Sequence, residues 1–178
     1  MKGENILYIV EGETEKRFID VLKQHYIISG KVIVYDLIKK QLTLNNLFLR
    51  TISSNTTVII VFDTDVDQEQ SVQRLSQNLL LLKTKIKHIK DVILIPQIAN
   101  LEGELIYSTN IKKIQDLIGC KSEKDFKKKF LKIQDHYLMN RLKEVNFQLS
   151  KIWSRAPKNK YKIFQNQSSK IKNKKLSN

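Results

Sequence analysis

The hydrophobic residues in the N-terminal part of the chain are gathered into four short, continuous runs. The runs cover Ile6–Val10, Val32–Tyr35, Val58–Phe62 and Val92–Ile95. Short uninterrupted apolar runs are typical of strands that are buried on both faces of a parallel sheet. We therefore predict four such strands.

Between and after these runs, apolar residues recur at three- and four-residue spacing, which is the pattern of an amphipathic helix. Helices are predicted from Thr14 to about Ser29, over Leu44–Ile52, after Asp67 and over Glu104–Ile118. Parallel strands must be joined by crossover connections, and helices usually supply them. The alternation predicts an α/β fold with a doubly wound, four-stranded parallel sheet flanked by helices.

The pattern changes after Gly119, beyond which no strand is predicted. Apolar residues there predict two helices, one after the capping residue Ser122 and one over Leu138–Ile152. The predicted parts are an α/β domain over residues 1–120, a basic helical extension over residues 121–167 and a flexible basic tail over residues 168–178.

Charge is distributed unevenly along the chain. The formal net charge is +14, and residues 101–178 contain 19 Lys and Arg against 7 Asp and Glu, a net charge of +12. Cations that neutralise phosphates release counterions and steer association, so the imbalance predicts a nucleic-acid partner, DNA or RNA. The alternative is a lysine-rich surface that only keeps the protein hydrated.

Four residues near the C-terminus combine cations with an aromatic ring. They are Lys151, Trp153, Arg155 and Lys158. We predict that they contact nucleic acid, with phosphates bound by the cations and a base stacked on the indole. Trp153 would serve equally well as a core residue.

The single cysteine, Cys120, excludes an internal disulfide and a cysteine-rich zinc site. The apolar run near the N-terminus is too short for a signal peptide, and no run approaches the roughly 20 residues of a membrane span. We expect a cytoplasmic protein without a membrane partner.

Acidic residues are concentrated in two five-residue windows, Glu11–Glu15 (EGETE) and Asp63–Asp67 (DTDVD). Each window directly follows a predicted strand. Ligand sites of open α/β sheets lie outside the carboxyl ends of the strands. If the first and third strands are neighbours in the sheet, the two windows face one crevice.

Carboxylates held this close repel each other and raise each other's pKa unless a cation neutralises them. Because neither window contains His or Cys, the oxygen ligands favour Mg²⁺ or Mn²⁺. An EF-hand loop is excluded, since Gln68 occupies the position that needs Gly and Arg74 the position that needs Glu. A purely structural alternative is that Asp65 or Asp67 caps the following helix.

A glutamate after the first strand and an Asp-x-Asp after the third also mark the Toprim domain. Topoisomerases, bacterial primases, RNA-processing nucleases and OLD (overcoming lysogenization defect) nucleases share this domain. Glu11, Asp63 and Asp65 resemble its motifs. The segment Val10–Lys16 is especially similar to the OLD-type subgroup, in which the second glutamate, here Glu15, is also a metal ligand.

The resemblance covers about residues 5–110 and implies further site residues. Asp67 continues the Asp-x-Asp pattern and is predicted as another metal ligand. Related small defence proteins carry a Phe-Glu motif after the fourth strand. Glu104 has a similar position, although Gly103 replaces the aromatic residue. The catalytic residues that the resemblance implies are Glu11, Asp63 and Asp65.

The function that the resemblance implies is Mg²⁺- or Mn²⁺-dependent hydrolysis of phosphodiester bonds in DNA or RNA, in defence against phages or mobile elements. The sequence lacks a Gly-x-x-x-x-Gly-Lys motif, so any accompanying ATPase would be a separate protein. We expect catalysis in the α/β part and nucleic-acid capture by the basic extension. An RNA-processing Toprim ribonuclease and a non-catalytic nucleic-acid-binding module remain alternatives, and the oligomeric state is open.

Overall fold

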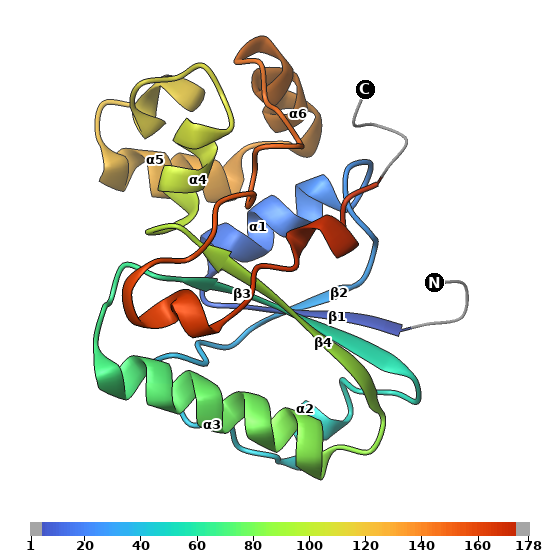
Figure 1. Cartoon of the computed structure of the whole chain (residues 1–178). Helices are drawn as coiled ribbons and strands as arrows, with labels where there is room; N and C mark the ends of the chain where they lie inside the picture. Colours follow the sequence, from blue (N-terminus) through green and yellow to red (C-terminus); the bar gives the residue numbers. More distant parts are fainter. Residues whose placement is uncertain (1–4, 174–178) are drawn as a thin grey trace.

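The computed structural model describes residues 5–173, and it contains one four-stranded parallel sheet (Figure 1). The strands are β1 (Asn5–Val10), β2 (Lys31–Val34), β3 (Thr56–Asp63) and β4 (Ile89–Gln97), in the order β2-β1-β3-β4. All neighbouring pairs are parallel. The predicted fold class is confirmed, and the first and third predicted strands are indeed neighbours.

Helices cover both faces of the sheet (Figure 1). The α-helices are α1 (Glu13–Leu22), α2 (Asn46–Leu49), α3 (Glu69–Lys85), α4 (Leu101–Tyr107), α5 (Glu123–Lys132) and α6 (Asp135–Glu144). The 3₁₀ helix η1 (Ile114–Leu117) lies between α4 and α5, and two more, η2 (Asn159–Ile163) and η3 (Ser168–Lys170), follow α6. Helices α1, α4, α5 and α6 lie on one face, and α2 and α3 lie on the other. No helix within residues 5–173 combines the length and apolar character that a membrane crossing requires.

The strand side chains alternate between two hydrophobic cores. Tyr8 and Val10 of β1 contribute to the core beneath α1, whereas Leu7 and Ile9 contribute to the core beneath α3. Each strand therefore needs apolar residues at consecutive positions, because both of its faces are covered. This requirement explains the continuous apolar runs in the sequence.

Four predicted helices are shorter than expected. The helix predicted from Thr14 to about Ser29 forms as α1 and ends at Leu22. The helix predicted over Leu44–Ile52 forms only as α2, and the one predicted over Glu104–Ile118 is divided into α4 and η1. Helix α6 ends at Glu144 because Asn146 adopts a left-handed conformation (φ 60°), which terminates helices. Leu149 and Ile152 are buried all the same, but they lie in turns.

Helices α5 and α6 pack into the same core as the first strand. Phe126 and Phe130 of α5 and Leu138 of α6 are fully buried in the cluster that contains Tyr8 and Val10. The helices expected as an extension after residue 120 thus share their hydrophobic core with the α/β part.

The chain after α6 runs across the edge of the sheet at β4 (Figure 1). The backbone N–H of Gln167 donates to the Leu94 carbonyl at 2.9 Å, and the Gln167 side chain accepts from the Leu94 N–H at 3.1 Å. These bonds use backbone groups that an edge strand would otherwise expose. Tyr161 and Phe164 continue onto the opposite face, where both rings contact Phe62.

The predicted flexible tail is wrong for residues 168–173. Ile171 is fully buried, its carbonyl accepts a hydrogen bond from the Ile28 N–H at 2.9 Å, and Lys172 forms a β-bridge with Ile27. These residues are therefore part of the packed structure. Residues 174–178, to which the same prediction applied, lie outside the described residues.

A fully buried amide on α3 fixes the loop that follows β2. Asn78 Oδ1 accepts from the Leu42 N–H at 2.8 Å and from the Gln41 side chain at 3.0 Å. Its Nδ2 donates to the carbonyls of Leu37 (2.8 Å) and Lys40 (2.9 Å). The amide thus satisfies polar groups that burial would otherwise leave without partners.

Replacement of this amide tests its importance for stability. Asn78→Ala should lower the free energy of unfolding by about 2–4 kcal/mol, because buried backbone groups lose their partners. The measurement is urea unfolding followed by circular dichroism. The matched control is Gln77→Ala, an exposed neighbour on the same helix, which should change stability by less than about 0.5 kcal/mol. Equal effects of the two changes would contradict this account.

Candidate functional site

The two acidic windows meet at the carboxyl edge of the sheet. Glu11 directly follows β1, and Asp63 is the last residue of β3. Because Val10 pairs with Val61 in the parallel ladder, the two carboxyl-bearing residues emerge side by side. The Asp63 backbone N–H donates to Glu11 Oε1 at 2.7 Å. The two acidic windows therefore lie side by side, as their positions after neighbouring strands predicted.

Glu15 reaches this edge from the first turn of α1, and Gly12 makes its position possible. A Cβ atom on residue 12 would lie only 2.8 Å from Glu15 Oε2. Burial raises the pKa of the Glu15 carboxyl, and backbone hydrogen bonds from Glu15 itself and from Gly12 offset only part of this rise. The Glu15 side chain therefore lies against the Gly12 backbone at the start of α1.

These three carboxyls are held in an environment that opposes ionisation. Burial is the main cause, and it raises the pKa of Glu11 to about 7 and that of Asp63 to about 9. The negative charges of Glu11 and Glu15 further raise the pKa of Asp63, and burial raises that of Glu15. The three groups cannot all be ionised at neutral pH without additional positive charge.

The two remaining aspartates of the second window differ in position. Asp65 is exposed, and its charge contributes to the raised pKa of Asp63, which places it at the rim of the cluster. Asp67 is also exposed, but its Oδ1 accepts a hydrogen bond from the Lys160 N–H at 3.4 Å. Asp67 is therefore directed toward the stretch that follows α6, residues 145–173, called here the C-terminal segment.

Glu104 is buried and its carboxylate is fully engaged elsewhere. Oε1 accepts from the Ile98 N–H at 2.8 Å and from the Arg155 guanidinium at 3.0 Å, while Oε2 accepts from the Trp153 N–H at 2.9 Å. These bonds direct both oxygens toward the C-terminal segment. The structure does not bring Glu104 into the group formed by Glu11 and Asp63.

Glu102, which the sequence reasoning did not select, lies at the cluster instead. Its charge raises the pKa of Glu15, and its Oε1 pairs with Lys127 Nζ at 3.2 Å. Residues two apart on a helix point in different directions, so only one of Glu102 and Glu104 can face the site. The periodicity of α4 alone does not say which one.

Trp153 is a core residue, which corrects its prediction as a base-stacking residue. Its side chain is fully buried and meets Phe18 edge to face at 5.9 Å between ring centroids. Arg155 also acts inside the protein, since it pairs with Glu104 and lies 4.4 Å from the centre of the Tyr107 ring. Of the four predicted nucleic-acid contacts, Lys151 and Lys158 remain exposed.

Two further polar residues at strand ends were not predicted as site residues. Gln97 is the last residue of β4, and its Nε2 donates to Asp63 Oδ1 at 2.7 Å. Asp36 follows β2, and its charge raises the pKa of Glu11. Both residues closely follow predicted strands, as Glu11 and Asp63 do, so their positions in the sequence indicate the same edge of the sheet.

Two exposed lysines flank the cluster. Lys39 pairs with Asp36 at 3.2 Å, and this contact, with smaller contributions from Glu11 and Asp65, raises its pKa. The pKa of Lys127 is raised by Glu102 first, and also by Glu15 and Asp63.

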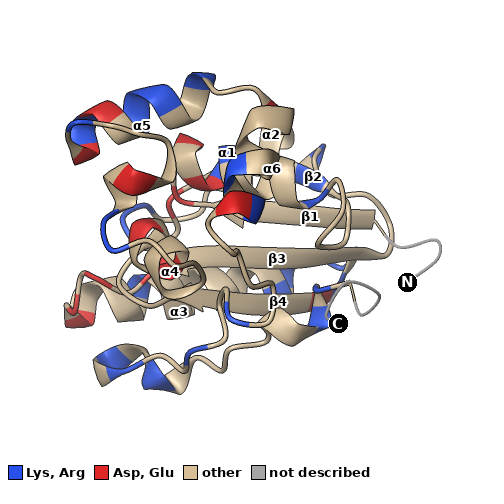
Figure 2. Cartoon of the chain, turned by 90° about the horizontal axis from the view of Figure 1, so that it is seen from above, with Lys and Arg blue, Asp and Glu red and all other residues tan. Residues whose placement is uncertain are grey.

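One of these lysines comes from the loop after β2 and the other from α5. Figure 2 shows basic positions on α5 at the same end of the sheet as the acidic positions that follow the strands. Cations therefore approach the acidic cluster from two different elements.

The donor set at this edge suits a hard divalent cation. Its side-chain oxygens come from Glu11, Glu15, Asp63 and Asp65, and oxygen ligands are those that Mg²⁺ and Mn²⁺ prefer. Within residues 5–173, no three His, Cys, Asp or Glu side chains are already arranged as a metal cage.

The sequence matches no protein-family model and no curated protein.

The raised carboxyl pKa values predict how stability depends on pH without metal. Asp63 has an ordinary pKa of 3.8 and a folded-state pKa of about 9, so the folded state binds its proton more tightly than the unfolded chain does. The resulting stabilisation is complete below about 3.8 and is lost as pH rises through about 9. In EDTA, the melting temperature should fall between pH 6 and pH 8.5, and it should fall less in Asp63→Asn.

Differential scanning calorimetry at the two pH values measures this difference. The comparison with Asp63→Asn removes the contribution of groups elsewhere in the chain. An identical fall in wild type and variant would show that Asp63 ionises freely in the folded protein.

Proposed function

We propose that this chain is a Mg²⁺- or Mn²⁺-dependent nuclease of the Toprim type, which hydrolyses phosphodiester bonds in DNA or RNA. The observation that carries the proposal is the half-buried pair of Glu11 and Asp63, joined by a 2.7 Å hydrogen bond at adjacent strand ends, with Glu15 beside it. A group of carboxyls with raised pKa values, placed where α/β sheets bind ligands, is a candidate for chemistry. The resemblance of both windows to Toprim motifs supports the same function.

Glu11, Glu15, Asp63 and Asp65 would hold the metal ions. Bound divalent cations supply activation of water and charge neutralisation at the scissile phosphate. Glu11 is the candidate general acid or base if it is not itself bound to a metal ion. Its Oε1 accepts from the Asp63 N–H, so Oε2 would exchange the proton.

Lys39 and Lys127 would attract the substrate to a site that is itself acidic. A polyanion is repelled by carboxylates, and exposed cations from two flanking elements offset this repulsion. Lys151 and Lys158 would extend the basic surface along the C-terminal segment, in which no acidic residue follows Lys151. Substrate capture would therefore involve both parts of the chain.

The biological setting is inferred from the resemblance alone. Similarity to OLD-type nucleases suggests action in the cytoplasm against phages or mobile elements, with any ATPase supplied by a separate protein. An RNA-processing ribonuclease of the same type would cleave structured RNA and spare DNA. A non-catalytic nucleic-acid-binding module would bind DNA or RNA without cleaving it, whichever metal ion was present.

Carboxyl substitutions test the proposed chemistry. Asp63→Asn and Glu11→Gln should each reduce cleavage of labelled DNA or RNA in Mn²⁺ by at least about 100-fold, the usual contribution of one positioned catalytic group. Binding measured by fluorescence anisotropy should be unchanged or tighter, because each change removes negative charge near the phosphate. Glu69→Gln, an exposed acidic residue at the start of α3, is the control and should cleave normally. Full cleavage by Asp63→Asn would contradict the proposal.

The flanking lysines are tested by the salt dependence of binding. The double change Lys39→Ala with Lys127→Ala should weaken binding across all sequences and reduce the slope of log affinity against log salt by about one unit per lost phosphate contact. Lys85→Ala is the control, because the last turn of α3 lies at the opposite edge of the sheet. A salt slope that the double change leaves unaltered would place substrate binding elsewhere.

A further inference from the structure

A chain of buried hydrogen bonds connects Asp63 to the C-terminal segment. Gln97, which is 1% exposed, donates from Nε2 to Asp63 Oδ1 at 2.7 Å. On its other side, Gln97 Oε1 accepts from the Trp153 indole N–H at 3.2 Å. The Trp153 backbone N–H in turn donates to Glu104 Oε2. The side chain of Gln97 therefore lies between the candidate metal site and residue 153.

The indole determines which way the Gln97 amide faces. An indole N–H can only donate, so the amide atom opposite it must be the oxygen. The amide nitrogen is then directed at Asp63, where a donated hydrogen bond favours the ionised carboxylate and occupies only Oδ1. In the reverse orientation, the amide oxygen would face a carboxylate oxygen and repel it.

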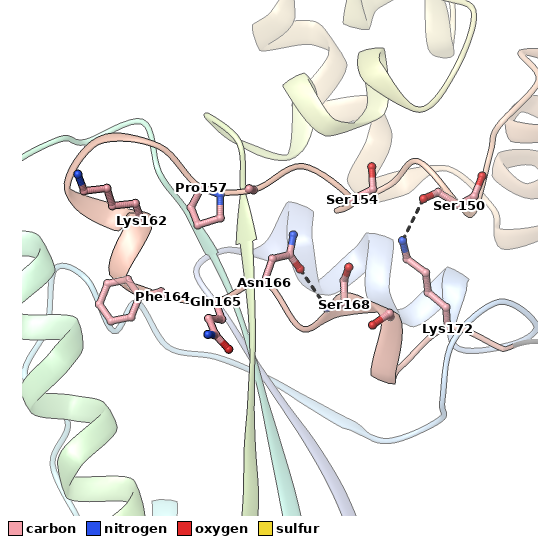
Figure 3. Close-up of a pocket in the computed structure, with 11 residues that line it drawn as sticks. Ser150, Ser154, Pro157, Lys162, Phe164, Gln165, Asn166, Ser168 and Lys172 are labelled. Carbon is pink, nitrogen blue, oxygen red and sulfur yellow. Dashed lines mark hydrogen bonds between the residues drawn. The ribbon is translucent and has the colours of Figure 1, made fainter.

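The backbone of Trp153 is held by two side chains of the C-terminal segment. Its carbonyl accepts from Asn166 Nδ2 at 2.7 Å and from Ser168 Oγ at 2.6 Å. Both residues line a pocket of about 640 Å³ on the C-terminal segment (Figure 3). The backbone of Trp153 has a φ of 53°, which is uncommon for a bulky residue and persists only where surrounding contacts enforce it.

Glu104 completes this support. It is fully buried, it fixes the Trp153 N–H, and Arg155 balances its charge through a 3.0 Å contact. The Glu104 carboxylate thus connects α4 to the C-terminal segment at the residue whose indole holds Gln97. These contacts with Trp153 and Arg155 account for the burial of the Glu104 carboxylate.

We propose that Gln97 is a positioning residue that presents Asp63 to the metal ion, and that Trp153 keeps Gln97 in the donating orientation. The inference rests on the proposed function, because it assigns these residues a role at the same site. It makes the C-terminal segment a structural component of the metal site, and it gives Glu104 a supporting role in place of metal ligation. Hydrogen bonds to metal ligands commonly change metal affinity by 10- to 100-fold when they are lost.

Metal affinity is the readout that separates positioning from stability. The dissociation constant for Mn²⁺ alone is measured from the electron paramagnetic resonance signal of the free ion, on the full chain. Trp153→Phe keeps an aromatic ring in the core but removes the indole N–H, and Gln97→Met keeps the length of the side chain but removes both hydrogen bonds. Each should weaken Mn²⁺ binding by about 10- to 100-fold. Phe18→Leu is the control, since it disturbs the packing around Trp153 without touching the hydrogen bonds, and its Mn²⁺ affinity should match wild type.

A spectroscopic readout is also accessible, because Trp153 is the only tryptophan in the sequence. Its indole N–H gives a single resonance, which should shift on addition of Mg²⁺ in the wild-type chain and should not shift in Gln97→Met. If wild type binds Mn²⁺ while Trp153→Phe and Gln97→Met bind it equally well, the positioning role is overturned and the proposed function stands. If wild type binds neither Mn²⁺ nor Mg²⁺, the proposed function itself fails.

Discussion

Glu11 and Asp63 are placed side by side because β1 and β3 are hydrogen-bonded neighbours, and their burial concentrates negative charge where the strands end. Burial and mutual repulsion both oppose ionisation, so the folded protein gains from a compensating cation or from protons. Other residues at this edge of the sheet accommodate or offset the concentrated negative charge. Gly12 allows Glu15 to approach, and Lys39 and Lys127 approach the cluster from two different elements.

The order of elements and the meeting of the two acidic windows were predictable from the sequence. Both depend on local signals: continuous apolar runs for strands covered on both faces, and acidic residues directly after those runs. The strand order needed one additional assumption, that the first and third strands are neighbours, and the sheet satisfies it. The lengths of the helices were less predictable, because single residues such as Asn146 end a helix whose apolar spacing continues.

The roles of Glu104 and Trp153 could not be predicted, because each depends on a contact between residues about 50 positions apart. Helical periodicity does not indicate whether Glu102 or Glu104 faces the cluster. An aromatic residue in a basic segment is equally consistent with base stacking and with burial. The packing of residues 168–173 against β4 and the segment after α1 could not be predicted either, because the polar composition of these residues resembles that of a flexible tail.

The α/β part and the C-terminal segment are therefore one physical unit, joined through Gln97, Trp153 and Glu104, although their charges differ greatly. Anomalous diffraction from a crystal soaked in Mn²⁺ shows directly whether the carboxyls at the strand ends bind a divalent cation. We expect a peak bounded by the carboxylates of Glu11, Glu15 and Asp63, and loss of that peak in Asp63→Asn. A fully soaked crystal with no peak at these residues, or with a peak that survives in Asp63→Asn, would contradict this expectation.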